Sequence, residues 1–352
     1  SIPAKIHLLN ECAFKQRSDN PALALSLARQ AQQLVTHASD YPTRYALSRQ
    51  IEGFCLWRLR DVNAAREIIH STLPVFEQHN ELHNYCFSLF LMGTISLHLD
   101  IPDEALGYYF QSAEVAEKTG DEHRQASAYA QIGRIYWRSC DYQLALDYLH
   151  RSLALYEKLG ATPYMADTLN NTGLVYMSLK EHKQALQYYR QALTIYSDIE
   201  DLQGQANALG NIGTAFEQLG RTKKALRYCH QALAMRRRLK DREGEANSLN
   251  SIGRIHLDFG DYLRALRYFI RSLRIYEEND NKHGQSPALN NIGSIYWNLG
   301  DSHRALAYFR KSLCIQEDIE DRHGQALSLL NIGNVYLKWQ EYDRALEYLL
   351  RC

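Results

Sequence analysis

A glycine that recurs every 40 residues is the feature that most constrains this chain. The other positions keep the same register: an alanine follows each of these glycines by 12 residues, from Ala65 to Ala345, and in seven units a tyrosine stands three residues after the alanine. Self-similarity at a fixed period is typical of repeat architectures. The 352 residues therefore need not be divided into separate globular domains. The eight glycines in register are Gly53, Gly93, Gly133, Gly173, Gly213, Gly253, Gly293 and Gly333.

Each 40-residue unit predicts two helices. In residues 241–280, apolar residues three and four positions apart run from Ala246 to Phe259, and a second such stripe runs from Ala265 to Tyr276. This spacing is one face of a helix. Between the stripes, Gly260 and Asp261 read as a helix stop and the cap of the next helix. We expect an antiparallel pair of helices of about 16 residues each, because the turn is so short. Further caps are expected at the unit boundaries, at Asp121, Asp201, Asp241, Asn281 and Asp321.

The recurring glycines lie in the middle of predicted helices, where a glycine costs about 1 kcal/mol relative to alanine. We expect a close approach of the two helices at glycine and alanine to outweigh this cost, with the aromatic residues wedged between successive hairpins. Two prolines fall inside predicted helices. A kink or early end is expected at Pro74, and a late helix start at Pro287 with Ser286 as its cap.

The unit resembles the tetratricopeptide repeat. The family pattern W-x2-L-G-x2-Y…A-x3-F appears as Leu289-x2-Ile292-Gly293-x2-Tyr296…Ala305-x3-Phe309. The period is 40 rather than 34, the closing proline is absent, and leucine replaces tryptophan in most units. Such longer units resemble those of kinesin light chains, Pins-type scaffolds and bacterial sensor modules. The resemblance implies an all-α, right-handed α-solenoid of stacked antiparallel hairpins.

The repeat register also predicts the domain organisation. Residues 1–40 are expected to form a degenerate hairpin. Residues 41–352 are expected to form eight units of 40 residues, the last cut short in its second helix. Stacked hairpins bury a continuous core that a single hairpin lacks, so we expect one solenoid.

The resemblance also implies where a ligand binds, because the first helix of each unit lines the concave face in this family. The lining positions are then six, three and two residues before the glycine, and one, four and five after it. Side-chain amides can donate to and accept from a peptide backbone, arginine can grip a carboxylate, and tryptophan can anchor a side chain. The alternative is that these residues pack and hydrogen-bond between helices. The candidates are Arg134, Trp137, Asn170, Asn171, Asn207, Asn211, Asn247, Asn250, Arg254, Asn290, Asn291, Trp297, Asn331 and Asn334.

Composition weakens the other classes of function. Forty basic residues balance 40 acidic ones, whereas a nucleic-acid-binding protein is usually basic. Residues 221–242 nevertheless hold nine basic residues against one acidic residue, which suggests an acidic or nucleic-acid partner unless neighbouring acidic residues balance them. Sequence patterns for a phosphate-binding loop, a zinc protease or a nucleophile elbow are absent. His79 and His83 have helical metal spacing but no further candidate ligand, so we expect no metal and no cofactor.

Three hypotheses of function follow. The first is a non-catalytic scaffold that holds an extended peptide or a protein segment in its concave groove. The second is a regulatory module of a larger bacterial signalling protein, with possible self-association through the apolar C-terminal end. The third is binding of nucleic acid or an acidic partner through residues 221–242. Seven cysteines without a CxxC pair and the lack of an apolar run long enough for a membrane span favour a cytoplasmic protein.

Overall fold

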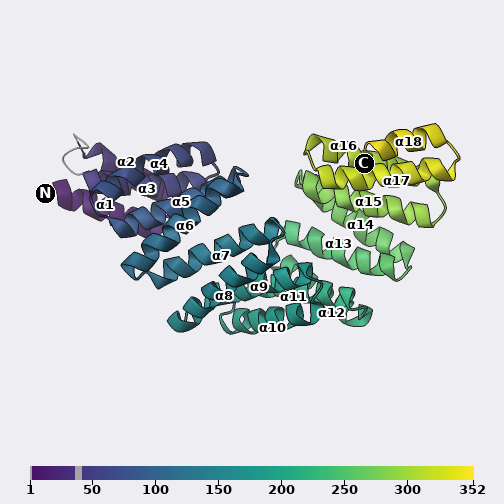
Figure 1. Ribbon diagram of the computed structural model, residues 1–352, viewed down its shortest axis with the longest axis horizontal. Helices are drawn as coiled ribbons and strands as arrows, with labels where there is room; N and C mark the ends of the chain where they lie inside the picture. The colour runs from purple at the N-terminus through teal and green to yellow at the C-terminus, as the bar shows by residue number, and fades with distance from the viewer. Residues whose placement is uncertain (1, 36–41) are drawn as a thin grey trace. The chain divides into compact units, whose positions relative to one another are not determined.

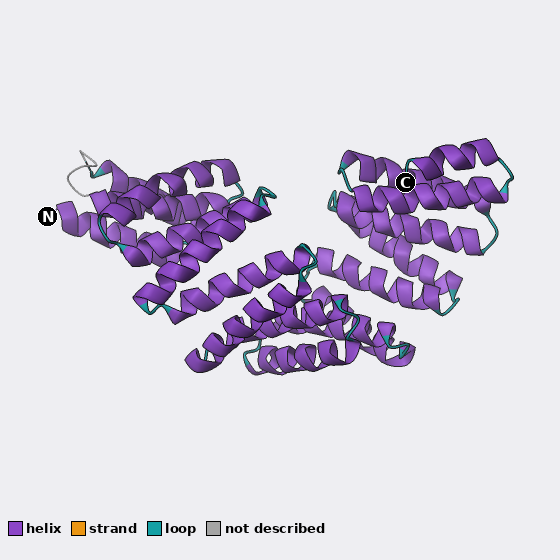
Figure 2. Ribbon diagram, viewed as in Figure 1, coloured by secondary structure: helices purple, strands orange, loops and turns teal. Residues whose placement is uncertain are grey.

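The structure is a computed structural model that describes residues 2–35 and 42–352. Within these ranges it contains eighteen α-helices and no strand (Figure 2). The chain forms two compact units, residues 1–175 and residues 176–352, and we describe each by itself. The expected boundary between residues 40 and 41 lies outside the described residues.

From α3 onward the helices follow one another with short turns (Figure 1). Unit 1 contains α1 (Ile2–Gln16), α2 (Pro21–Gln33), α3 (Pro42–Arg58), α4 (Val62–Gln78), α5 (Leu82–His98), α6 (Pro102–Thr119), α7 (Glu122–Arg138) and α8 (Tyr142–Leu159). The division between the units falls within α9 (Thr162–Ser178). Unit 2 contains α10 (His182–Asp198), α11 (Leu202–Gln218), α12 (Thr222–Arg238), α13 (Arg242–Asp258), α14 (Tyr262–Glu278), α15 (Lys282–Asn298), α16 (Ser302–Asp318), α17 (Arg322–Lys338) and α18 (Tyr342–Leu350).

Within each unit, every helix packs against the next one along the chain, and the first helices of successive hairpins also touch, as α3 and α5 do in unit 1 and α13 and α15 in unit 2. Within each unit, successive hairpins thereby share their apolar faces, which is the arrangement of an α-solenoid. The predicted all-α solenoid of stacked antiparallel hairpins is confirmed.

The expected caps hold the helix starts. Asp241 accepts a hydrogen bond from the backbone N–H of Gly244 at 2.8 Å, and Asn281 accepts one from Gly284 at 2.9 Å. Within the hairpin of α13 and α14, Gly260 has a φ of 79° and Asp261 caps α14. A positive φ suits glycine because it has no Cβ. The predicted stop and cap are therefore confirmed.

The mid-helix glycines lie where two helices approach closely. A Cβ on Gly213 would lie 2.5 Å from Cys229 Sγ and 3.4 Å from the carbonyl oxygen of Ala225. A Cβ on Gly253 would lie 2.9 Å from a ring carbon of Phe269. The close approach predicted from the sequence is confirmed, and a side chain of the second helix fills the space over both glycines.

The recurring aromatic residues pack both within a hairpin and between successive hairpins. Tyr136 stacks on Tyr148 with ring centroids 5.8 Å apart, and Tyr296 stacks on Tyr308 at 5.5 Å. Each of these pairs joins the two helices of one hairpin, and Tyr148 also packs edge-on against Phe110 of the preceding hairpin with ring centroids 5.6 Å apart, as the prediction of aromatic contacts between hairpins requires. The second ring still packs against the preceding hairpin, as Tyr148 does against the buried cluster that contains Tyr109.

The early helix end expected at Pro74 and the late helix start expected at Pro287 are both wrong. Pro74 lies inside α4, which continues to Gln78, and the buried residues Thr72 and Phe76 anchor the helix on either side of it. Pro287 lies inside α15, which already begins at Lys282 under the Asn281 cap. Tertiary packing and a strong cap outweigh the single backbone hydrogen bond that each proline removes.

Acid should weaken unit 2 through His256, which is 8% exposed and stacks on Tyr268. Burial lowers the pKa of His256, with Arg264 and His230 adding to this effect and Asp261 opposing it. Because the folded state then binds a proton less readily than the unfolded state, stability is full above the unfolded pKa of about 6.5 and falls as the pH drops through it. Urea midpoints at pH 7.5 and 5.5 should show a smaller loss for His256→Tyr than for the wild type, and equal losses would contradict this assignment.

Candidate functional site

A hollow of about 500 Å³ lies in unit 1 against helices α3, α5 and α7. Eleven of the twelve residues around it stand at the lining positions of three successive 40-residue repeats, and the twelfth is Tyr109 of α6. Its walls are largely apolar and aromatic, and its polar groups come mainly from α7. The lining residues are Phe54, Trp57, Phe87, Phe90, Leu91, Thr94, Leu97, His98, Tyr109, Gln131, Arg134 and Arg138.

The walls of the hollow are held by contacts between neighbouring rings. Phe54 packs edge-on against Trp57 with ring centroids 5.5 Å apart, and Phe90 packs edge-on against Tyr109 at 5.2 Å. Thr94 joins this wall through a 3.0 Å hydrogen bond to the hydroxyl of Tyr109. Burial raises the pKa of Tyr109 to about 12, while the bond to Thr94 acts in the opposite direction. Tyr109 is therefore a neutral part of the wall at physiological pH.

Arginines give the hollow a positive character. Arg134 is exposed and its guanidinium donates to Gln131 Oε1 at 2.9 Å, while Arg138 lies 3.6 Å from Asp100. The guanidinium carbon of Arg17 lies 5.6 Å from the centre of the Phe54 ring. Burial lowers the pKa of Arg17, and the charge of Arg124 adds to this effect. An apolar recess beside several cations is suited to an apolar group that carries a negative charge nearby.

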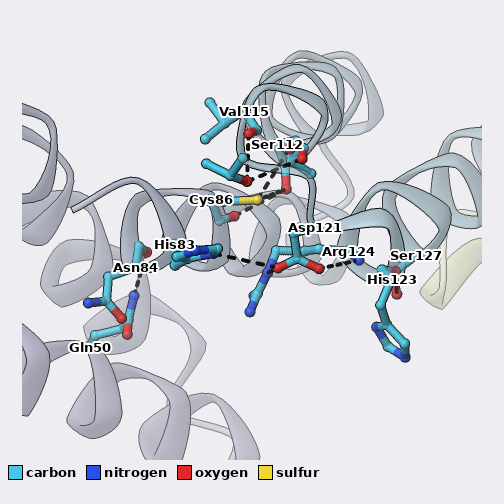
Figure 3. A network of polar contacts seen from close by, with 12 residues as sticks. Gln50, His83, Asn84, Cys86, Ser112, Val115, Asp121, His123, Arg124 and Ser127 are labelled. Carbon is cyan, nitrogen blue, oxygen red and sulfur yellow. Dashed lines mark hydrogen bonds and ion pairs between the residues drawn. The ribbon is translucent and has the colours of Figure 1, made fainter. Parts of the chain in front are cut away.

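A polar network fixes the helices around this hollow (Figure 3). Asp121 caps α7 and binds the guanidinium of Arg124 at 3.0 Å, and the Arg124 guanidinium lies 5.1 Å from the Phe87 ring centre. Burial alone would raise the pKa of Asp121, but its hydrogen bonds from Arg124 hold it below the usual value. On α3, Gln50 donates to the carbonyl oxygen of Asn84 at 2.7 Å (Figure 3).

The remaining candidates of unit 1 do not line this hollow. Trp137 is half-buried and packs against the cluster formed by Ala145, Leu149 and Val175, as the packing alternative expected. Asn170 and Asn171 are half-buried on α9. Of the four candidates in unit 1, only Arg134 belongs to the hollow.

Two candidates of unit 2 serve internal contacts. Asn290 is 5% exposed and donates to Ser328 Oγ at 2.8 Å, so it joins two successive first helices and its expected place on an open face is wrong. Arg254 already binds a carboxylate, through hydrogen bonds of 2.8 and 2.6 Å to Glu217. The expectation that Arg254 is free to grip a ligand is therefore wrong as well.

Other candidates of unit 2 reach the surface. Asn207 and Asn247 are exposed and accept hydrogen bonds from Arg236 and Tyr276 of the second helices, at 3.2 and 2.6 Å. Lys338 lies with its Nζ 4.6 Å from the ring centre of Trp297. Asn334 is exposed, and the half-buried candidates are Asn211, Asn250, Asn291, Trp297 and Asn331.

The basic segment 221–242 is partly neutralised by neighbours. Arg237 pairs with Glu245 at 2.9 Å, and Arg242 pairs with both Glu245 and Glu278. Arg236 turns inward and donates to the carbonyl oxygen of Gly244 at 2.7 Å. These contacts favour the interpretation that neighbouring acidic residues balance this charge.

Sequence reasoning missed several residues of the hollow. Phe54, Phe87 and Phe90 occupy lining positions. They were not among the candidates because these were only asparagines, arginines and tryptophans. Arg17 lies near the Phe54 ring but is not one of the twelve lining residues, and it stands 40 residues before Trp57, so extending the repeat register into the degenerate first hairpin would have pointed to it.

The family model of the tetratricopeptide repeat matches residues 85–158, 124–198, 164–238, 204–278 and 285–352. Because these matches cover more than half of the chain, the chain belongs to the tetratricopeptide repeat family. Among curated proteins, none matches it significantly by sequence.

Solved structures with the same fold include three that cover almost the whole chain. The apo form of the quorum sensor NprR from B. thuringiensis has a TM-score of 0.72 at 11% identity, covering 99% of this chain and 96% of that one. A Rap protein complexed with Competence and Sporulation Factor has a TM-score of 0.69 at 16% identity, covering 99% and 96%. Aspartyl phosphate phosphatase F from Bacillus subtilis has a TM-score of 0.65 at 15% identity, covering 100% and 92%. At these identities the likeness concerns the fold alone.

In the described part of the chain, no group of three or more histidine, cysteine, aspartate or glutamate side chains is placed to hold a metal ion. Among residues 2–35 and 42–352, no helix is both long enough and apolar enough to cross a bilayer.

Proposed function

We propose that this chain is a non-catalytic binding module that holds an extended peptide or a segment of a partner protein along its lining positions. The observation that carries the proposal is the hollow of about 500 Å³ in unit 1, which is formed by the lining positions of three successive 40-residue repeats. Small-ligand and side-chain pockets are typically concave and mostly apolar, with a few polar groups that orient the ligand. Here the aromatic rings supply the apolar surface, and Arg134 and Arg138 supply the polar groups.

A sensory use of the same groove is the second candidate. It is supported by the similarity of fold to the quorum sensor NprR. In this case the bound segment would be a signal, and the output would belong to another domain or protein. The binding chemistry is the same, so one experiment serves both candidates.

Reversing the charge of Arg134 should abolish selective binding. Dodecapeptides selected from a random library on the full chain should bind Arg134→Glu at least about tenfold more weakly, which corresponds to about 1.4 kcal/mol. Arg134 is exposed and donates to a neutral glutamine, Gln131, so the melting temperature should not change. Fluorescence anisotropy with the selected peptides measures the affinity.

The matched control is Arg151→Glu, which reverses an exposed charge of α8 that lies outside the hollow and pairs with Asp147. Its affinity for the selected peptides should equal that of the wild type. If both variants weaken binding equally, or neither does, the peptides do not bind in this hollow and the proposal for unit 1 fails.

A further inference from the structure

One hairpin of unit 2 carries an arginine where its neighbours carry a tyrosine. Arg236 of α12 stands 40 residues after Tyr196 and 40 residues before Tyr276. The hydroxyl of Tyr276 reaches a lining position of its own hairpin, where it donates to Asn247 at 2.6 Å. The guanidinium of Arg236 reaches the equivalent position and donates from Nη2 to Asn207 at 3.2 Å. The exchange therefore brings a positive charge to the lining positions.

The charge of Arg236 has only neutral partners among the described residues. Its Nη1 donates to the carbonyl oxygen of Gly244 at 2.7 Å and to Ser248 Oγ at 3.0 Å. The carboxylate of Asp241 instead accepts bonds from the Gly244 N–H at 2.8 Å and from Gln203 Nε2 at 3.2 Å. Burial lowers the pKa of Arg236, with Asp241 acting against this, but a guanidinium stays protonated in proteins. A half-buried cation without a carboxylate partner is costly unless an anion binds it.

A second difference from the other repeats, in the same hairpin, leaves space beside the guanidinium of Arg236. Gly210 stands three residues before Gly213, at the lining position that Asn170, Asn250 and Asn290 occupy in other 40-residue repeats. A Cβ at Gly210 would lie 3.6 Å from Arg236 Nη2. An asparagine there would extend its side chain from this point, beside the guanidinium. Glycine leaves that side of Nη2 without a covering side chain at residue 210.

We propose that Arg236 and Asn207 form a carboxylate-binding site for an acidic residue of a peptide that lies along the lining positions of unit 2. Arg236 Nη2 has two N–H groups and uses one on Asn207 Oδ1, and Asn207 Nδ2 donates to no described residue. The site therefore presents two donors to the two oxygens of one carboxylate, and one donor is charged, which strengthens the bond. This inference rests on the proposed function, because it assumes that a peptide occupies the lining positions.

Capped dodecapeptides test the site on the full chain. We expect rhodamine-labelled (Asp-Ala)6 to bind at least about tenfold more tightly than (Asn-Ala)6, a difference of about 1.4 kcal/mol. Arg236→Tyr restores the residue of the neighbouring hairpins and should reduce the affinity for (Asp-Ala)6 to that for (Asn-Ala)6. Gly210→Asn should weaken (Asp-Ala)6 in the same direction. An (Asn-Ala)6 peptide with a free C-terminus distinguishes a terminal carboxylate from a side-chain carboxylate.

The control is Arg238→Gln, which removes one exposed charge from the same basic segment. It should leave the preference for (Asp-Ala)6 almost intact, with melting temperatures of all variants compared by circular dichroism. Equal weakening by Arg238→Gln and Arg236→Tyr would show a diffuse electrostatic attraction and overturn the inference. Equal affinity of the wild type for both capped peptides would overturn it too, while leaving the Arg134 test of the proposed function unaffected.

Discussion

Gly213→Leu should destabilise unit 2 by more than about 3 kcal/mol, the upper part of the range for overpacked cores. Its Cβ alone would lie 2.5 Å from Cys229 Sγ, 3.3 Å from the backbone nitrogen of Cys229 and 3.4 Å from the carbonyl oxygen of Ala225. The side chain of Cys229 can turn away, but the backbone atoms of α12 cannot yield without separating the two helices. Urea denaturation followed by circular dichroism measures the loss, and hydrogen exchange should locate it in α11 and α12.

The matched control is Ser251→Leu, two residues before the equivalent Gly253. Ser251 is half-buried and its hydroxyl donates to the carbonyl oxygen of Asn247 in the same helix. Leucine there should change the stability by no more than about 0.5 kcal/mol. Similar losses for the two variants would contradict the close approach as the reason for the glycine.

Arg254→Met should destabilise unit 2 by about 3–5 kcal/mol, because it leaves the carboxylate of Glu217 without its cation. The Glu217 side chain is only 5% exposed, and Arg254 binds it through two hydrogen bonds between α13 and α11. The Glu217 bond raises the pKa of Arg254, while burial opposes this rise. The same urea experiment measures the effect.

A double variant separates the cost of the orphaned charge from the value of the pair. Glu217→Leu with Arg254→Met should recover most of the lost stability, since apolar replacement of a buried ion pair is often neutral or stabilising. As a control, Arg264→Met removes an exposed partner of Asp261 and should cost less than about 1 kcal/mol. A double variant as unstable as Arg254→Met alone would show that the ion pair itself is needed.

The candidate site was less predictable than the fold. The lining positions identified the hollow in unit 1, since almost all residues of the hollow occupy them. They did not distinguish residues that face a ligand from residues that face a neighbouring helix. Asn290 and Asn207 are both lining amides, yet one bonds Ser328 of the next hairpin and the other is exposed. Asn207 stands six residues before its glycine, a position that is exposed in the five repeats from Asp167 to Leu327, whereas Asn290 stands three residues before its glycine and faces the next hairpin.

The sequence by itself determined the helices, their caps, the glycine contacts and the repeat architecture, because each depends on residues close in the chain or on a pattern repeated many times. Only the tertiary structure decided which cations have partners. Arg254 binds Glu217 from another hairpin, whereas Arg236 meets neutral groups beside a glycine. Such pairings join residues 8 to 37 positions apart across helix contacts, so charge and spacing alone cannot assign them. Side-chain packing between hairpins sets them.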